Sequence, residues 1–187
     1  MERFRIGFGF DSHRFDTTRK LTLGGVSIPD CPGLHGHSDA DVLLHAVIDA
    51  VLGSVAAGDI GGHFSDRDPQ WKGADSRELL RRVLALPALR GWRLVNLDCT
   101  VIAEAPRLAP HIAAIRASLA ALFGCGVEAV SVKAKTNEGL DAVGARQAIQ
   151  ATAVLLAEIC PQNTQNTQNA QNAQSTQHTQ NTQRGNA

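Results

Sequence analysis

Apolar residues recur along the chain at intervals that predict strands and helices in turn. Between Phe4 and Phe15 alternate positions are apolar and glycines interrupt the run, which predicts a strand that continues into a loop. Leu21–Leu23 and Val26–Ile28 flank two glycines, as in a short hairpin or a bulge. Further strands are predicted at residues 94–103, with Val95, Leu97, Cys99 and Val101 on one face, and at residues 127–135.

Four other segments have the period of α-helices. A strongly apolar helix is predicted to begin at Ser38, with acidic residues in its first turn, and to end near Gly53. A second is predicted from Asp75 or Ser76 to about Gly91. Two more are predicted at residues 110–123 and 145–159. Because strands and helices alternate, we expect an α/β (α+β layered) fold, a small mixed sheet with helices packed on one face.

The composition changes abruptly at Pro161. Residues 161–187 are a tract of Gln, Asn and Thr with an approximate three-residue repeat and no large apolar side chain. Such a tract cannot bury enough apolar surface to offset the entropy lost on ordering, so we predict a folded domain at 1–160 and a disordered tail at 161–187. Self-association of the tract as stacked strands is the alternative, which no aromatic residue supports.

The composition of the chain argues against several classes of protein. Of 187 residues, 18 are Lys or Arg and 18 are Asp or Glu, so the formal net charge is zero and we expect no nucleic-acid partner. The sequence has neither a bilayer-spanning apolar stretch nor a signal peptide, so we expect a cytoplasmic protein without a membrane partner. The four cysteines are scattered without a C-x-x-C pair, which favours reduced thiols over a zinc ribbon.

Three residues form a candidate metal site. Asp11 and His13 lie two positions apart in an extended segment, so their side chains point to the same side. His45 lies within an apolar helix, where an imidazole costs desolvation energy unless it has a partner. One Asp and two His leave an open position on a tetrahedral zinc, which is typical of catalytic sites. Asp49, one turn after His45, either orients that ligand or simply bonds to a buried histidine.

Three polar clusters are candidates for substrate binding. Residues 35–41 precede the apolar helix, where backbone N–H groups attract phosphate, although capping by Ser38 would explain them equally. Residues 58–66 form a polar loop that either binds a ligand or only connects two helices. Residues 133–139 offer two lysines, a hydroxyl and a carboxylate for Mg²⁺ and phosphate, or are merely the surface end of a strand.

Six motifs follow one another at definite spacing. They are residues 9–13 (Gly-Phe-Asp-Ser-His), 36–41 (Gly-His-Ser-Asp-Ala-Asp) with His45, 58–61 (Gly-Asp-Ile-Gly), 74–80 (Ala-Asp-Ser-Arg-Glu-Leu-Leu), 102–107 (Ile-Ala-Glu-Ala-Pro-Arg) and 133–138 (Lys-Ala-Lys-Thr-Asn-Glu). Together they resemble the motifs of the 2-C-methyl-D-erythritol 2,4-cyclodiphosphate synthase family, and the resemblance runs from about residue 5 to residue 159.

The resemblance implies a role for each motif. It implies one zinc ion per chain at Asp11, His13 and His45, and a second metal, Mg²⁺ or Mn²⁺, at Glu138. It implies substrate contacts from His37, Ser38, Asp59, Ile60, Gly61, Phe64, Asp66, Ala103, Pro106, Arg107, Leu108, Lys135 and Thr136. Among these, His37 and Thr136 are the catalytic candidates.

The resemblance implies that each motif contacts a different part of the substrate. His37 and Ser38 match groups at the phosphorylated methylerythritol, whose hydroxyls Asp66 holds. Residues 59–61 match contacts to the ribose, and residues 103–108 match the wall of the cytosine pocket. Residues 135–136 match contacts to the diphosphate.

The reaction implied by the resemblance is a cyclisation. It converts 4-diphosphocytidyl-2-C-methyl-D-erythritol 2-phosphate to 2-C-methyl-D-erythritol 2,4-cyclodiphosphate and CMP, in the non-mevalonate (MEP) pathway to isoprenoid precursors. A phosphate monoester attacks the β-phosphorus, and because its second pKa is about 6 it needs no strong general base. The implied enzyme is a metal-dependent phosphorus–oxygen lyase. It is also a homotrimer with sites between chains, in which Thr136 and Glu138 would serve a neighbour's zinc.

Two departures from the family pattern are visible. After Glu138 the family has an aromatic residue and a Gly-Arg-Gly-Glu-like segment, whereas residues 141–147 read Asp-Ala-Val-Gly-Ala-Arg-Gln. In the family this region lines a cavity on the trimer axis that accepts isoprenoid diphosphates, and we do not expect that regulatory site here. Ser65 replaces a frequent proline beside Asp66, which we expect to be a minor change.

Two other functions fit the same residues. A zinc phosphohydrolase would use the same three ligands with a water nucleophile, but it would need a base beside the open zinc position and no nucleotide pocket. A non-catalytic protein would bind zinc and CDP without turnover. Metal ligands combined with separate nucleotide and phosphate clusters favour the cyclase.

Overall fold

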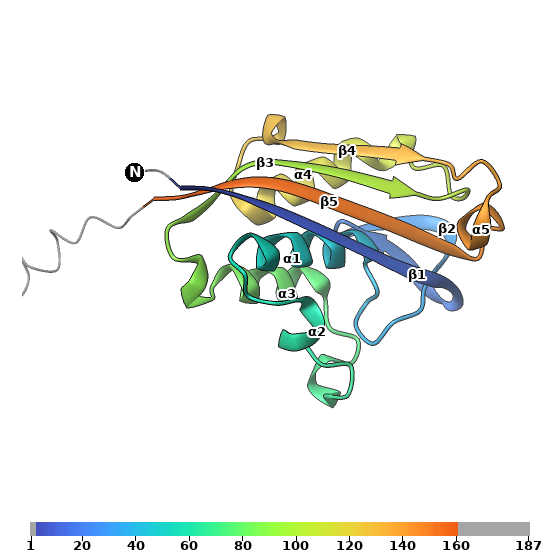
Figure 1. Ribbon diagram of the computed structural model, residues 1–187. Helices are drawn as coiled ribbons and strands as arrows, with labels where there is room; N and C mark the ends of the chain where they lie inside the picture. Colours follow the sequence, from blue (N-terminus) through green and yellow to red (C-terminus); the bar gives the residue numbers. More distant parts are fainter. Residues whose placement is uncertain (1–2, 161–187) are drawn as a thin grey trace, which may run out of the picture.

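A mixed five-stranded sheet organises the chain (Figure 1). The computed structural model describes residues 3–160, and the predicted tail, residues 161–187, lies outside the described residues. The strands are β1 (Arg3–Leu23), β2 (Val26–Leu34), β3 (Trp92–Ile102), β4 (Val130–Lys135) and β5 (Ala148–Ile159). Their order in the sheet is β2-β1-β5-β3-β4, in which β3 and β4 are parallel and the other neighbours antiparallel.

The longer helices pack on one face of the sheet, behind the strands in the view of Figure 1. The helices are α1 (Val42–Ser54), α2 (Ile60–His63), α3 (Ser76–Leu84), α4 (Ile112–Phe123) and α5 (Asp141–Gly144). α1 lies against β1 and β5, α4 lies against β4, and α3 packs on both helices. The predicted layered α/β fold is therefore confirmed. Within residues 3–160, no helix is long and apolar enough to cross a membrane.

The start of α1 is fixed by a buried carboxylate. Asp41 is fully buried and caps the helix by accepting the backbone N–H of Leu44 (3.0 Å). It also accepts the N–H groups of Gly24 (2.9 Å) and Gly25 (2.7 Å), so it ties the β1–β2 turn to the helix. Burial raises the pKa of Asp41 to about 6, although these three donors oppose the shift.

β1 presents two different faces. A Cβ atom added to Gly7 or Gly9 would collide with the backbone of α1, so these odd-numbered residues face the helix. The even-numbered residues point the other way. Phe4, Ile6, Phe8 and Phe10, together with Val154 on β5, are 44% to 73% exposed. We call these five side chains the outer sheet face.

The prediction of a last helix at residues 145–159 was wrong. Residues Ala148–Ile159 form β5, which pairs with both β1 and β3 near the middle of the sheet. Its alanines favour a helix locally, but Ala151, Ala153 and Ala157 are small enough to pack beneath α1 and are fully buried. Tertiary packing therefore decided the structure of this segment.

Several predicted boundaries also move. The first helix begins at Val42 and not at Ser38, because Asp41 is its cap and Ala40 adopts a left-handed conformation (φ 60°). The second helix ends at Leu84, and a 3₁₀ turn at Pro87–Leu89 follows it. Residues Val127–Ala129 form a 3₁₀ turn before β4.

Two predicted details concern single residues. In β3 a bulge between Leu94 and Asn96 exposes Val95 and buries Leu94 instead, so Val95 does not share a face with Leu97. The predicted end of α4 at Gly124 is confirmed, since Gly124 adopts the left-handed conformation (φ 64°) at the helix end.

The four cysteines, Cys31, Cys99, Cys125 and Cys160, form no disulfide, as expected.

Candidate active site

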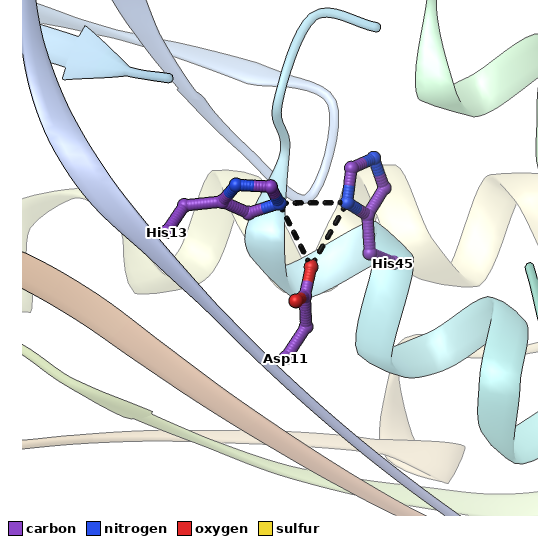
Figure 2. A group of neighbouring side chains, drawn as sticks. All are labelled: Asp11, His13 and His45. Atoms are coloured by element: carbon purple, nitrogen blue, oxygen red, sulfur yellow. Dashed lines mark hydrogen bonds and ion pairs between the residues drawn. The ribbon is translucent and has the colours of Figure 1, made fainter. Parts of the chain in front are cut away.

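Three side chains from β1 and α1 converge on one point (Figure 2). Asp11 Oδ2 lies 2.9 Å from His13 Nε2 and 2.9 Å from His45 Nδ1. The two histidine nitrogens lie 3.0 Å from each other. The sequence spacing that pointed to these three residues therefore brings together three candidate ligand atoms.

The strand and the helix place these groups by simple geometry. Asp11 and His13 continue the row of odd-numbered residues that begins with Gly7 and Gly9 and faces α1. The glycines allow the strand and the helix to approach closely, and the longer side chains that follow reach His45 at the helix's first turns.

Hydrogen bonds orient the His13 ring. Its Nδ1 lies 2.7 Å from the carbonyl oxygen of His35, which can only accept, so Nδ1 donates there and Nε2 is the ring nitrogen that faces Asp11. Burial opposes the charged form of both side chains. Even so, hydrogen bonds with His13 and then His45 hold the pKa of Asp11 below its usual range, and Asp11 raises the pKa of His13.

The three atoms fit a divalent metal. Tetrahedral zinc holds N and O ligands at about 2.0–2.2 Å, which places the ligand atoms about 3.3 Å from one another. The observed separations of 2.9–3.0 Å are close to this value. Because an aspartate and two imidazoles supply only three ligands, the fourth position is left for water or substrate. The arrangement is that of a divalent-metal site.

A pocket of about 380 Å³ opens beside the three ligands. Its walls include further residues predicted from the sequence, namely His37, Ser38, Ile60, Gly61, Phe64 and Asp66. Trp71 and Leu79 also line it, and the rings of Phe64 and Trp71 pack edge to face with centroids 4.9 Å apart. The pocket is thus polar at the metal site and apolar along one wall.

The loop that carries His37 and Ser38 is held from two sides. Arg19 donates to the carbonyl oxygens of Gly36 (2.7 Å) and Ser38. His37 Nε2 lies 3.0 Å from the carbonyl oxygen of Asp68, to which it donates. Both side chains are therefore presented to the pocket by a braced backbone.

Asp59 and Asp49 each accept a hydrogen bond from the backbone of the segment that follows α1. Asp59, next to Ile60, accepts the N–H of Gly62 (2.8 Å) and caps α2. Asp49 accepts the N–H of Ile60 (2.7 Å). The expectation that Asp49 orients His45 was therefore wrong, because His45 Nε2 instead contacts the hydroxyls of Ser38 (3.0 Å) and Ser76 (3.1 Å).

The predicted phosphate cluster lies away from the three ligands within one chain. Lys135, Thr136 and Glu138 are exposed, and the hydroxyl of Thr136 donates to Glu138 (2.7 Å). Lys135 at the end of β4 and His13 on β1 are separated by β3 and β5, which corresponds to about 14 Å across the sheet. None of the three cluster residues lines the pocket beside the metal ligands.

The predicted cytosine wall lies at the same end of the sheet as the phosphate cluster. Ala103 and Leu108 are buried and Arg107 is exposed. Pro106 lines a second pocket, of about 430 Å³, with residues of β1 and β2. Glu104, which the sequence did not single out, accepts the N–H groups of Asn137 (2.9 Å) and Gly139 (3.2 Å) and so connects the two clusters.

Comparisons with known proteins identify the family of this chain. The sequence profile of the YgbB family matches residues 4–158. A 2-C-methyl-D-erythritol 2,4-cyclodiphosphate synthase of Dechloromonas aromatica is 57% identical over 155 residues, a match that covers 83% of this chain and 97% of that protein.

Two solved structures are similar as well. A 2C-methyl-D-erythritol-2,4-cyclodiphosphate synthase in its CDP-bound form matches with a TM-score of 0.75 and 39% identity, over 82% of this chain and 99% of that one. The bifunctional IspDF of Campylobacter jejuni matches with a TM-score of 0.81 and 34% identity, over 86% of this chain and 43% of that one. The chain belongs to the YgbB family, in which its relatives are 2-C-methyl-D-erythritol 2,4-cyclodiphosphate synthases, and the family predicted from the motifs is confirmed.

Proposed function

We propose that this chain converts 4-diphosphocytidyl-2-C-methyl-D-erythritol 2-phosphate to 2-C-methyl-D-erythritol 2,4-cyclodiphosphate and CMP, in the MEP pathway to isoprenoid precursors. The observation that carries the proposal is the convergence of Asp11, His13 and His45 within 3.0 Å beside a pocket of about 380 Å³. The names of the relatives, at 53–57% identity, support the same reaction. Such a cyclase is a metal-dependent phosphorus–oxygen lyase.

The described residues suit a reaction that depends on position. The substrate supplies its own nucleophile, a phosphate monoester with a second pKa of about 6, so the protein needs no nucleophile of its own. Its tasks are to bend the substrate and to align the attack, and alignment can contribute about 7–11 kcal/mol in well-oriented intramolecular reactions. The braced loop of His37 and Ser38 would hold the phosphate, and Asp66 would hold the methylerythritol hydroxyls.

The ligand set favours zinc among the divalent metals. Two imidazoles and one carboxylate are typical donors for zinc, whereas Mg²⁺ prefers oxygen ligands alone. Zinc bound by Asp11, His13 and His45 would supply a Lewis acid for a phosphate oxygen of the substrate. Glu138, with its carboxylate beside the Thr136 hydroxyl, would hold Mg²⁺ or Mn²⁺ between phosphates.

Assembly as a homotrimer would unite the separated clusters. Lys135, Thr136 and Glu138 lie about 14 Å across the sheet from the metal ligands, too far to share one diphosphate within a chain. The outer sheet face is apolar and 44–73% exposed, which is typical of a surface that a partner covers. In the trimer, the nucleotide and phosphate residues of one chain would complete the metal site of a neighbour.

We place the enzyme in the cytoplasm, in agreement with its free cysteines.

Turnover followed by phosphorus NMR tests the proposal. The substrate is incubated with the full chain loaded with zinc, with and without a chelator. Stoichiometric CMP and cyclic diphosphate, lost on chelation, are expected. CMP together with a linear product would indicate a phosphohydrolase, and no turnover by a zinc-loaded, folded protein would indicate a binding protein.

A further inference from the structure

The ring of His45 contacts a second set of polar groups on its far side. Its Nδ1 faces Asp11 and His13, while its Nε2 lies 3.0 Å from the Ser38 hydroxyl and 3.1 Å from the Ser76 hydroxyl. These three residues are no more than 8% exposed. Because buried polar atoms need partners, the protons among these groups must be arranged in a definite way.

Asp39 determines where the Ser76 proton lies. The Ser76 hydroxyl donates to Asp39 Oδ1, and the backbone N–H of Ser76 donates to Asp39 Oδ2 (3.0 Å). A carboxylate only accepts, and a hydroxyl has a single hydrogen to give. Toward His45, Ser76 can therefore only accept, which favours the tautomer with the proton on Nε2 once a metal takes the lone pair of Nδ1.

Asp39 is itself held in place by the backbone. Its Oδ1 also accepts the N–H of Asp41 (3.2 Å), and its own N–H donates to the carbonyl oxygen of Ala74 (2.9 Å). These contacts connect the start of α1 to the start of α3. The carboxylate is thus aimed at Ser76 from a braced position.

We propose that Ser76 and Asp39 are positioning residues for the metal site. With a metal at the point shared with Asp11 and His13, they would hold the proton of His45 on Nε2, so that the lone pair of Nδ1 is directed at the metal. This inference rests on the proposed metal-dependent function and assigns to Ser76 and Asp39 the orienting role that spacing had suggested for Asp49. Partners of this kind fix the tautomer of a ligand histidine and raise its basicity.

The same arrangement determines what Ser38 can do. When Nε2 of His45 carries the hydrogen, as proposed for the metal-bound site, it cannot accept the hydroxyl hydrogen of Ser38. The Ser38 oxygen in turn accepts the N–H of Ala40 (3.2 Å). The Ser38 hydrogen is therefore available to the pocket that Ser38 lines, where it would donate to a phosphate oxygen of the substrate.

Zinc affinity of the full chain tests the proposal, measured by competition with a chromogenic chelator. Ser76→Ala and Asp39→Asn are each expected to weaken zinc binding about 10-fold, the low end of the usual range because Ser38 still contacts Nε2. Ser54→Ala is the matched control, since Ser54 is also buried and hydrogen-bonded but lies at the far end of α1. It should leave the zinc affinity unchanged.

Long-range ¹H–¹⁵N NMR of the zinc-loaded protein provides an independent readout. The ring proton of His45 is expected on Nε2 and that of His13 on Nδ1. A His45 proton on Nδ1, or equal zinc affinity in Ser76→Ala and Ser54→Ala, would overturn the proposal. Asp11→Ala separates this result from a failure of the proposed function: if that variant binds zinc as the wild type does, the metal site itself is wrongly placed.

Discussion

Gly9 of β1 lies directly against the carbonyl oxygen of Ala46 in α1, at a distance that leaves no room for a side chain. A Cβ atom at Gly9 would stand 1.9 Å from that oxygen. Ala46 follows His45, and Gly9 precedes Asp11 by two positions on the same face of the strand. This contact therefore sets the separation between the two elements that carry the metal ligands.

Gly9→Ala is expected to destabilise the fold and to weaken zinc binding, because the methyl group must push β1 away from α1. Overpacking of this kind costs about 1–3 kcal/mol. Urea unfolding with and without zinc measures both effects. Gly53→Ala is the control, since its Cβ would meet only Phe8 O at 3.7 Å and replacing glycine within a helix stabilises by about 0.5–1 kcal/mol. Equal stability of the two variants would contradict the packing argument.

His45→Ala is expected to abolish zinc-dependent turnover without unfolding the protein. The change removes one of three ligand atoms, whereas the apolar residues of α1 and its Asp41 cap remain. Product formation, zinc content and far-UV circular dichroism are compared with those of the wild type. Wild-type activity in this variant would contradict the assignment of His45 to the metal site.

Asp41 is expected to make stability depend on pH. Its pKa is raised by burial from 3.8 to about 6, so the folded protein holds this proton more tightly than the unfolded chain does. The stabilisation from this proton is complete below pH 3.8 and is lost as pH rises through about 6. Asp41→Asn cannot titrate, so the wild type should lose stability relative to this variant across that interval. Urea unfolding at several pH values measures the difference, and a constant difference would contradict the expectation.

Glu104 is expected to matter through the loop it holds. Its Oε1 accepts two backbone N–H groups on either side of Glu138, which adopts a left-handed conformation (φ 50°). Glu104→Ala removes both bonds, at a cost of about 1–3 kcal/mol, and should lower kcat/KM. Glu104→Gln keeps an oxygen at that place and should retain most activity. If both variants lose activity equally, the charge of Glu104 and not its hydrogen bonding is required.

The outer sheet face is expected to hold the proposed trimer together. Ile6 is 73% exposed there, and Ile6→Asp would place a charge where apolar surface is buried on assembly. Light scattering after size exclusion should show the mass of a single chain, with turnover lost because no site is complete. Val127→Asp, at a 45% exposed position in the 3₁₀ turn before β4, is the control and should leave assembly intact.

The metal ligands could be predicted from sequence because local geometry determines most of their arrangement. Asp11 and His13 share a face in any extended strand, and an unpaired His45 in an apolar helix is costly. The partner of His45 could not be predicted in the same way. Asp49 is the neighbour along the helix, whereas Ser76 is 31 residues away and reaches His45 only through the packing of α3 on α1.

The last strand, β5, could not be predicted from its local sequence for a different reason. The alanines at 151, 153 and 157 favour a helix when the segment is considered alone. They form a strand because the sheet needs a member with small side chains between β1 and β3, beneath α1. Propensity describes the isolated segment, and only the assembled sheet shows why small residues alternate there.

Because β1 has two different faces, the three metal ligands converge only when β1 pairs with β5 in the observed register. A slip of one residue against β5 would turn Phe8 and Phe10 toward α1, where only glycine fits, and would point Asp11 and His13 away from His45. A mispaired chain would therefore lose both its packing and its metal affinity at once. Zinc would then bind only chains that have folded in register, and its presence during refolding should raise the yield of correctly paired protein.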